Sequence, residues 1–227
     1  MFKNIRDKIL GKSPVYRTLE LPITLRVALP NEVPMNETVL ANINKSKTAK
    51  IVEGYTIKLK DDTPENSTLE FKFFSEINID NSRLWKLFIE LTDFLPNEVA
   101  LIFGHIDDDE VNYGNYTNKT DVINFLNKYE KELTSDTYLK FGLIFHSDNQ
   151  LVEVFVDETK YIKFWGVDRN TFENNLQGFG LTNIEDLEFI DEYPKVRHPL
   201  ITLDETVVDT SKLLELLKAE YITTANI

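Results

Sequence analysis

Three consecutive stretches of alternating apolar and polar residues constrain the fold more than any other feature of this sequence. Residues 138–146, 151–157 and 160–165 each repeat with a period of two. This period sends successive side chains to opposite faces of a β-strand. The connection at 147–150 is polar and is typical of a hairpin turn. We therefore predict an antiparallel meander of three strands in this part of the chain.

The other strands and helices follow from hydrophobic periodicity in the same way. Residues 18–29 alternate throughout and predict the clearest strand of the chain. Pro22 would place that strand at a sheet edge or at a bulge, because proline has no N–H for the ladder. Helices are predicted where apolar residues recur every three or four positions behind a capping residue. The remaining predicted strands lie at 50–60, 69–74, 98–106 and 186–192, and the predicted helices lie at 2–10, 82–95, 121–133, 169–179 and 210–221.

The order of these elements indicates an α+β protein, in which helices pack on a mainly antiparallel sheet. The order strand, strand, helix, strand occurs within 50–106 and again within 149–192. A duplicated strand-strand-helix-strand unit is one explanation, and ordinary α+β connectivity is the other. We predict a single compact protein over 1–227, and the alternative is two fused, related lobes at 15–118 and 119–227.

Composition removes several kinds of chemistry. The 227-residue chain has no cysteine, which excludes disulfides, thiolate metal sites and cysteine nucleophiles. Imidazole chemistry is limited to His105, His146 and His198. No glycine-rich phosphate loop or serine nucleophile elbow occurs, so we expect no cofactor. The first residues lack an apolar signal segment, and no apolar run is long enough to span a membrane, so we expect a cytoplasmic protein.

The charge of the chain narrows the classes of partner. Its 38 acidic and 25 basic residues give a formal net charge of −13, which repels nucleic acid and anionic membranes. Such a charge keeps a protein soluble, and it also suits a basic protein partner. Acidic residues gather at 107–110, 185–192 and 204–205, where they form either one negative surface or a solvated rim.

One local cluster suggests metal chemistry. His105, Asp107 and Asp109 follow a predicted buried strand and share the same parity, so they offer a nitrogen and two carboxylates to a divalent ion. A calcium-binding loop that starts at Asp107 would need glycine and glutamate where Asn112 and Asn118 stand. The alternative is a solvated acidic loop after a strand.

The meander also predicts a binding face. Alternate residues of each strand point to the same face of the sheet. If one set of alternate residues lies in the core, the opposite face carries Glu153, Phe155, Tyr161, Lys163 and Trp165. Aromatic residues interleaved with charges are typical of protein-binding surfaces. The alternative is that a helix, or the other half of the chain, covers this face. The predicted contact residues are Glu153, Phe155, Tyr161, Lys163 and Trp165, together with Asp107, Asp108, Asp109 and Glu110.

Two segments resemble the small acidic immunity proteins that bacteria encode beside secreted polymorphic toxins. They are residues 141–166, FGLIFHSDNQLVEVFVDETKYIKFWG, and residues 96–110, PNEVALIFGHIDDDE. The resemblance is one of general character over about half the chain. It implies a cytosolic inhibitor without catalytic residues, which binds a toxin domain through acidic and aromatic side chains.

Three functions are therefore consistent with the sequence. We favour a protein-binding protein whose partner is basic, most specifically an immunity-type inhibitor of a toxin domain. One alternative is a metal-assisted hydrolase that uses His105, Asp107 and Asp109. The other is a structural or assembly protein that associates with itself through the edge of the 19–29 strand.

Overall fold

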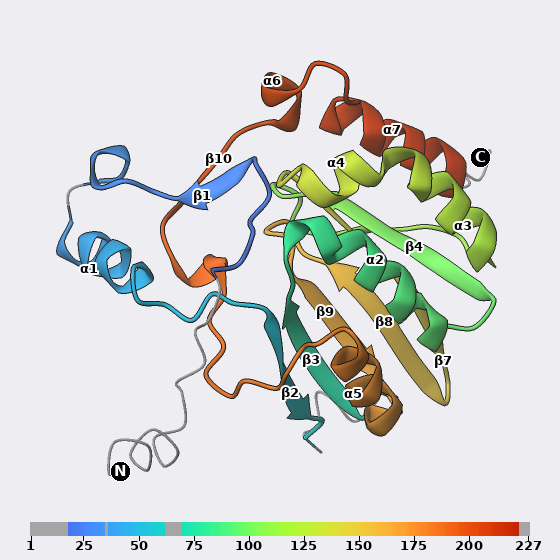
Figure 1. Ribbon diagram of the computed structural model, residues 1–227. Helices are drawn as coiled ribbons and strands as arrows, with labels where there is room; N and C mark the ends of the chain where they lie inside the picture. Colours follow the sequence, from blue (N-terminus) through green and yellow to red (C-terminus); the bar gives the residue numbers. More distant parts are fainter. Residues whose placement is uncertain (1–17, 35, 62–69, 223–227) are drawn as a thin grey trace, which may run out of the picture.

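A single sheet of eight strands forms the centre of the computed structural model, which describes residues 18–34, 36–61 and 70–222 (Figure 1). Neighbouring strands are antiparallel throughout, in the order β2, β3, β9, β8, β7, β4 and β5, and β6 also pairs with β4. The strands are β2 (Gly54–Leu59), β3 (Phe73–Asn78), β4 (Glu98–His105), β5 (Asn112–Tyr113), β6 (Thr117–Asn118), β7 (Leu139–Ser147), β8 (Gln150–Val156) and β9 (Ile162–Gly166).

A second, two-stranded sheet pairs β1 (Leu25–Val27) with β10 (Lys195–Arg197). The α-helices are α1 (Glu37–Ser46), α2 (Asn81–Leu91), α3 (Lys119–Leu126), α4 (Glu130–Ser135), α5 (Arg169–Gly178), α6 (Leu200–Leu203) and α7 (Thr210–Tyr221), and the short 3-10 helices are η2 (Pro30–Glu32), η3 (Thr92–Phe94), η4 (Asn127–Tyr129) and η5 (Ile190–Glu192). The predicted α+β class, with helices on a mainly antiparallel sheet, is confirmed.

The predicted meander corresponds to β7, β8 and β9, which follow one another along the chain and lie side by side in the sheet. A tight turn joins β8 to β9 through Lys160, whose φ of 66° lies in the left-handed region. The Lys160 ammonium is buried and donates a hydrogen bond of 2.6 Å to the Leu139 carbonyl oxygen of β7. The side chain of the turn thus ties all three strands together, although burial lowers the pKa of Lys160 to about 8.

The strand predicted over 18–29 is wrong for most of its length, because only β1 is extended and paired. The Pro22 carbonyl oxygen accepts a hydrogen bond from the Leu25 N–H at 3.0 Å, which turns the chain before β1. Ile23 and Leu29 are 66% and 54% exposed, so the alternation here does not mark a buried face. The predicted helix over 2–10 lies outside the described residues.

Several smaller predictions also differ from the structure. The strand predicted at 69–74 is displaced to Phe73–Asn78, and the helix predicted at 121–133 is interrupted by η4. The segment 186–192 is not a strand, so the second of the two repeated units lacks its last strand. The connection after β4 contains the short strands β5 and β6, which pair back onto β4.

The hydrophobic core lies between the sheet and the helices. Figure 1 shows α2 and α5 lying across the sheet, with α3, α4 and α7 near β4. Phe73 of β3, Phe164 of β9 and Phe172 of α5 are fully buried, and their rings contact one another. Each such side chain contributes about 1.5–3 kcal/mol by leaving water. Burial of this one face fixes the register of the strands, and the register in turn determines which side chains lie on the opposite face.

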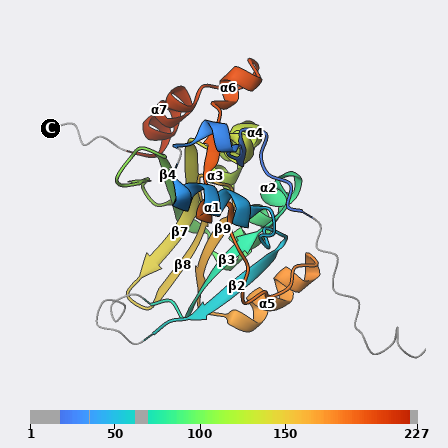
Figure 2. The same ribbon diagram turned by 90° about the vertical axis from the view of Figure 1, so that its left-hand side faces the viewer.

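The opposite face of the sheet, which we call the open face, is much less covered. Figure 2 shows α2 and α5 on one side of the sheet, and none of the helices formed by residues 18–34, 36–61 and 70–222 lies on the far side of β7 and β8. In β8 and β9 the residues of the core parity, such as Val154 and Phe164, are fully buried, whereas Phe155 and Trp165 between them are only half-buried. This difference follows from the side-chain alternation of strands that have helices on one face only.

Candidate functional site

Cross-strand register gathers four of the predicted contact residues at the middle of the open face. Glu153 of β8 lies opposite Trp165 of β9, and Phe155 lies opposite Lys163. Trp165 also lies opposite Phe74 of β3, with ring centroids 4.7 Å apart. Side chains directly opposite each other in an antiparallel pair are close enough to contact. We call these five half-buried residues the aromatic patch.

The ring of Phe155 lies over Gly142 of β7, its cross-strand neighbour. A Cβ atom placed on Gly142 would lie 2.9 Å from the Phe155 ring and 2.5 Å from the carbonyl oxygen of Val154. Only glycine leaves room for this arrangement, because both distances are shorter than van der Waals contact. Gly142 therefore positions an aromatic ring of the patch.

Glu153 is the acidic residue of the aromatic patch. Its strand neighbours on the open face are Ile144 and Trp165, and among the described residues its carboxylate has no hydrogen bond or ion pair. Burial among these apolar groups raises the pKa of Glu153 to about 7, and the positive charge of Lys163 opposes this effect only in part. A carboxylate in such surroundings favours a cation that approaches from outside.

Lys163 is already paired within the chain. Its ammonium lies 2.5 Å from a carboxylate oxygen of the buried Asp157 and 5.2 Å from the ring centroid of Tyr161. These contacts engage the Lys163 ammonium with Asp157 and Tyr161, and it forms no ion pair with Glu153. The patch therefore presents aromatic rings and one acidic group without a strong internal ion pair.

Tyr161 differs from the other predicted contact residues, because it is only 7% exposed. The ring of Phe189 packs on it, with centroids 4.8 Å apart, and Val52 and Leu187 complete this small second core. The segment 183–192 folds back over the open face at this point. Tyr161 is therefore the wall of a groove instead of an exposed anchor.

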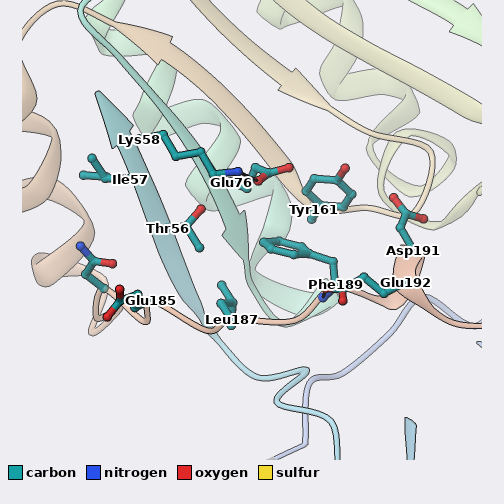
Figure 3. Close-up of a pocket in the computed structure, with 11 residues that line it drawn as sticks. Thr56, Ile57, Lys58, Glu76, Tyr161, Glu185, Leu187, Phe189, Asp191 and Glu192 are labelled. Atoms are coloured by element: carbon teal, nitrogen blue, oxygen red, sulfur yellow. Dashed lines mark hydrogen bonds and ion pairs between the residues drawn. The ribbon is translucent and has the colours of Figure 1, made fainter. Parts of the chain in front are cut away.

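The groove lies between that segment and the edge of the open face, and it measures about 870 Å³. Figure 3 shows Phe189 pointing from the segment toward Tyr161, and Lys58 beside Glu76. Sequence reasoning missed this groove, although the alternation of Leu187 and Phe189 with acidic residues marked a segment with one buried face. The described residues that line it are Thr56, Ile57, Lys58, Glu76, Tyr161, Asn183, Glu185, Leu187, Phe189, Asp191 and Glu192.

The acidic residues predicted at 107–110 lie in the connection between β4 and β5. The carboxylate of Asp108 accepts a hydrogen bond of 2.9 Å from the His105 N–H, and the Asp108 carbonyl oxygen accepts one of 3.2 Å from Lys140. Asp109 and Glu110 are exposed. Burial raises the pKa of Tyr113 in β5, and the charges of Glu153 and Glu110 raise it further, so the aromatic patch and this loop both lie near the same exposed ring.

The same loop does not assemble a ligand set for a metal ion. His105 Nδ1 and a carboxylate oxygen of Asp107 are 3.4 Å apart, and the His105 ring stacks on Tyr138 at 5.7 Å. Asp109 does not join them: the described residues contain no group of three or more histidine and carboxylate side chains placed to hold a metal. The hydrolase hypothesis therefore has no geometric support in this part of the chain.

The unusual pKa of Glu153 predicts a pH-dependent stability. The unfolded carboxyl ionises near pH 4.5 and the folded one near pH 7, so the folded state binds more protons between these values and loses stability as the pH rises through them. We expect Glu153→Gln to match the parent protein at pH 4.5 and to exceed its free energy of unfolding by about 2 kcal/mol at pH 8. Urea unfolding at the two pH values measures this difference.

The control for this experiment is Glu215→Gln, at an exposed position of α7. We expect Glu215→Gln to change stability by less than about 0.5 kcal/mol at both pH values. A Glu153→Gln variant with the same advantage at pH 4.5 and pH 8 would show that Glu153 ionises normally.

Comparison with protein-family models, with curated proteins and with solved structures found no match for this chain. Among residues 18–34, 36–61 and 70–222, no helix combines the length and the apolar character that crossing a membrane requires.

Proposed function

We propose that this chain is a cytoplasmic protein that binds a basic protein partner through the open face, and that the partner is a toxin domain which it inhibits. The observation that carries the proposal is the aromatic patch around Glu153. Trp165, Phe155 and Phe74 are half-buried by one another and by the sheet, and in the part of the chain that the structure describes α2 and α5 cover the other face (Figure 2). The net charge of −13 supports a basic partner.

The patch has the composition of an energetic centre of an interface. Aromatic rings bury a large area at a small cost in side-chain entropy, and tryptophan is enriched among the residues that dominate binding energy. Glu153 would gain a cationic partner and become ionised on binding, since an adjacent positive charge lowers the pKa of a carboxyl group. Inhibition would then follow from steric coverage of the toxin domain and needs no catalytic residue in this chain.

The proposal predicts that a gene beside the one for this chain encodes a secreted protein that carries the toxin domain, and that domain is the probe of the test. We expect Trp165→Ala to weaken binding at least about thirtyfold in calorimetry, because the truncation removes an interface anchor. Co-expression of the same variant should no longer restore growth of cells that produce the toxin domain. Far-UV circular dichroism establishes that the variant is folded.

The matched control is Gln177→Ala, which alters an exposed residue of α5 on the opposite side of the sheet. We expect this variant to bind the probe like the parent protein. Equal affinities of Trp165→Ala and Gln177→Ala for the probe would contradict the proposed binding face.

A further inference from the structure

The outer edge of the sheet at β2 provides backbone groups for another strand. The Tyr55 N–H donates to the Thr182 carbonyl oxygen at 3.0 Å, and the Ile184 N–H donates to the Tyr55 carbonyl oxygen at 2.9 Å. Both backbone groups of Tyr55 therefore point away from β3. Because this direction alternates along a strand, the backbone groups of Ile57 and Leu59 point outward as well.

The segment 182–184 covers only the first part of this edge. It makes one parallel bridge, between Tyr55 and Asn183, and then turns away, with the Leu187 N–H bonded to the Ile184 carbonyl oxygen. Within the described residues the outward N–H and C=O groups of Ile57 and Leu59 have no hydrogen-bond partner, and Leu59 is 66% exposed. An unpaired edge of this kind is a template for strand addition.

The groove described above opens beside this edge, because Thr56, Ile57 and Lys58 of β2 line it. An added strand would send alternate side chains to the same side as Thr56 and Lys58, which is the side of the groove. The lining holds four carboxylates, from Glu76, Glu185, Asp191 and Glu192, against the single ammonium of Lys58. The aromatic rings of Tyr161 and Phe189 form its wall (Figure 3).

Three of these carboxylates already have partners, which leaves Glu185 to meet a ligand. Glu76 lies 3.5 Å from Lys58, Asp191 lies 3.0 Å from Lys195, and Glu192 accepts the Phe189 N–H at 2.9 Å. Glu185 is exposed at the groove rim and forms no hydrogen bond or ion pair with described residues. Charge complementarity therefore favours lysine or arginine in the added strand.

We infer that the β2 edge and the groove together bind an extended segment of another protein, which pairs with Ile57 and Leu59 and places a lysine or arginine side chain near Glu185. The inference deepens the proposed function, since it names the kind of segment that the basic partner supplies. Main-chain hydrogen bonds would give affinity, and the acidic groove would select the side chain.

The test uses the ¹⁵N-labelled full chain and two capped hexapeptides, one with alternating lysine and valine and one with alternating glutamate and valine. We expect the lysine peptide to slow amide hydrogen exchange of Ile57 and Leu59 at least about tenfold at millimolar concentration, because exchange requires opening of the new hydrogen bonds. The glutamate peptide should leave both amides unprotected.

Two variants sharpen the test. Glu185→Lys should weaken binding of the lysine peptide at least about tenfold, whereas Glu215→Lys on α7 should leave binding unchanged. Ile57→Pro removes one outward N–H but retains the ladder with β3, so it should fold and lose peptide binding. If Ile57→Pro does not fold, the peptide affinities of Glu185→Lys and Glu215→Lys are compared to decide whether the peptide binds at the groove.

Three results would overturn the inference. The first is that the lysine peptide binds without protecting the amides of Ile57 and Leu59. The second is that Glu185→Lys binds this peptide as tightly as Glu215→Lys does. The third is that both amides become protected when the protein concentration rises without peptide, which would assign the edge to a second copy of the chain. Trp165→Ala should bind the lysine peptide normally. Failure of the peptide test is thus distinguishable from failure of the proposed open-face interface.

Discussion

Replacement of Gly142 by alanine is expected to lower the free energy of unfolding by about 3 kcal/mol, because the new Cβ atom has no space in the sheet. It would lie 2.5 Å from the Val154 carbonyl oxygen and 2.9 Å from the Phe155 Cα atom, and both belong to the backbone of the paired strand β8. Backbone atoms in the centre of a sheet have little freedom to move away. Urea unfolding of the variant measures the loss.

Gly178 provides the matched control, since it ends α5 and a Cβ atom there would meet nothing within 4 Å. We expect Gly178→Ala to be neutral or to stabilise by up to about 1 kcal/mol, because alanine favours the helix. A Gly142→Ala variant as stable as Gly178→Ala would show that the β7–β8 register, and with it the position of the Phe155 ring, is wrong.

Phe164→Ala is expected to have the largest effect on stability, about 3–5 kcal/mol, because it leaves a cavity under the sheet. Phe164 is fully buried, and its ring contacts Phe172 at 4.5 Å, Phe94 at 5.4 Å and Phe73 at 5.7 Å between centroids. These partners come from β3, η3 and α5, so the loss would loosen the joint between the sheet and its helices. Thermal and urea unfolding measure the effect.

Leu203 is the control for this truncation, because it is 49% exposed in α6. Leu203→Ala should change the free energy of unfolding by less than about 0.5 kcal/mol. A Phe164→Ala variant that loses less than 1 kcal/mol would place Phe164 outside a tightly packed core, contrary to the assignment of the two sheet faces.

Alternation predicted the central meander, because most residues of the core parity in β7, β8 and β9 are buried whereas most residues between them are only half-buried. The same pattern failed at β1, where Pro22 turns the chain and Ile23 is exposed. Strand periodicity reports which residues share a side, and it does not by itself establish that this side is buried. Only packing against helices, which depends on distant parts of the chain, decides the question.

Alternation predicted which residues of the candidate site share a face of the sheet, but not which of them are covered. Parity placed Glu153, Phe155, Lys163 and Trp165 on one face, and the register confirms that they lie together. Tyr161 shares their parity but is buried by Phe189, which is distant in sequence and reaches it only because the segment 183–192 folds back. The groove and the partners Phe74 and Gly142 likewise depend on contacts between distant strands, which no local pattern encodes.

The most direct test of the open face as the binding surface uses thiol footprinting, which the absence of native cysteine makes possible. Single cysteines are introduced at Ile144 of β7, which is half-buried on the open face, and at Gln177 of α5, which is exposed on the opposite side. Each variant is alkylated alone and in complex with the toxin domain used as the probe. We expect the complex to slow alkylation of Ile144→Cys at least about tenfold and to leave Gln177→Cys unchanged, since the centre of an interface excludes solvent. Slower alkylation of Gln177→Cys, with Ile144→Cys unaffected, would contradict the account.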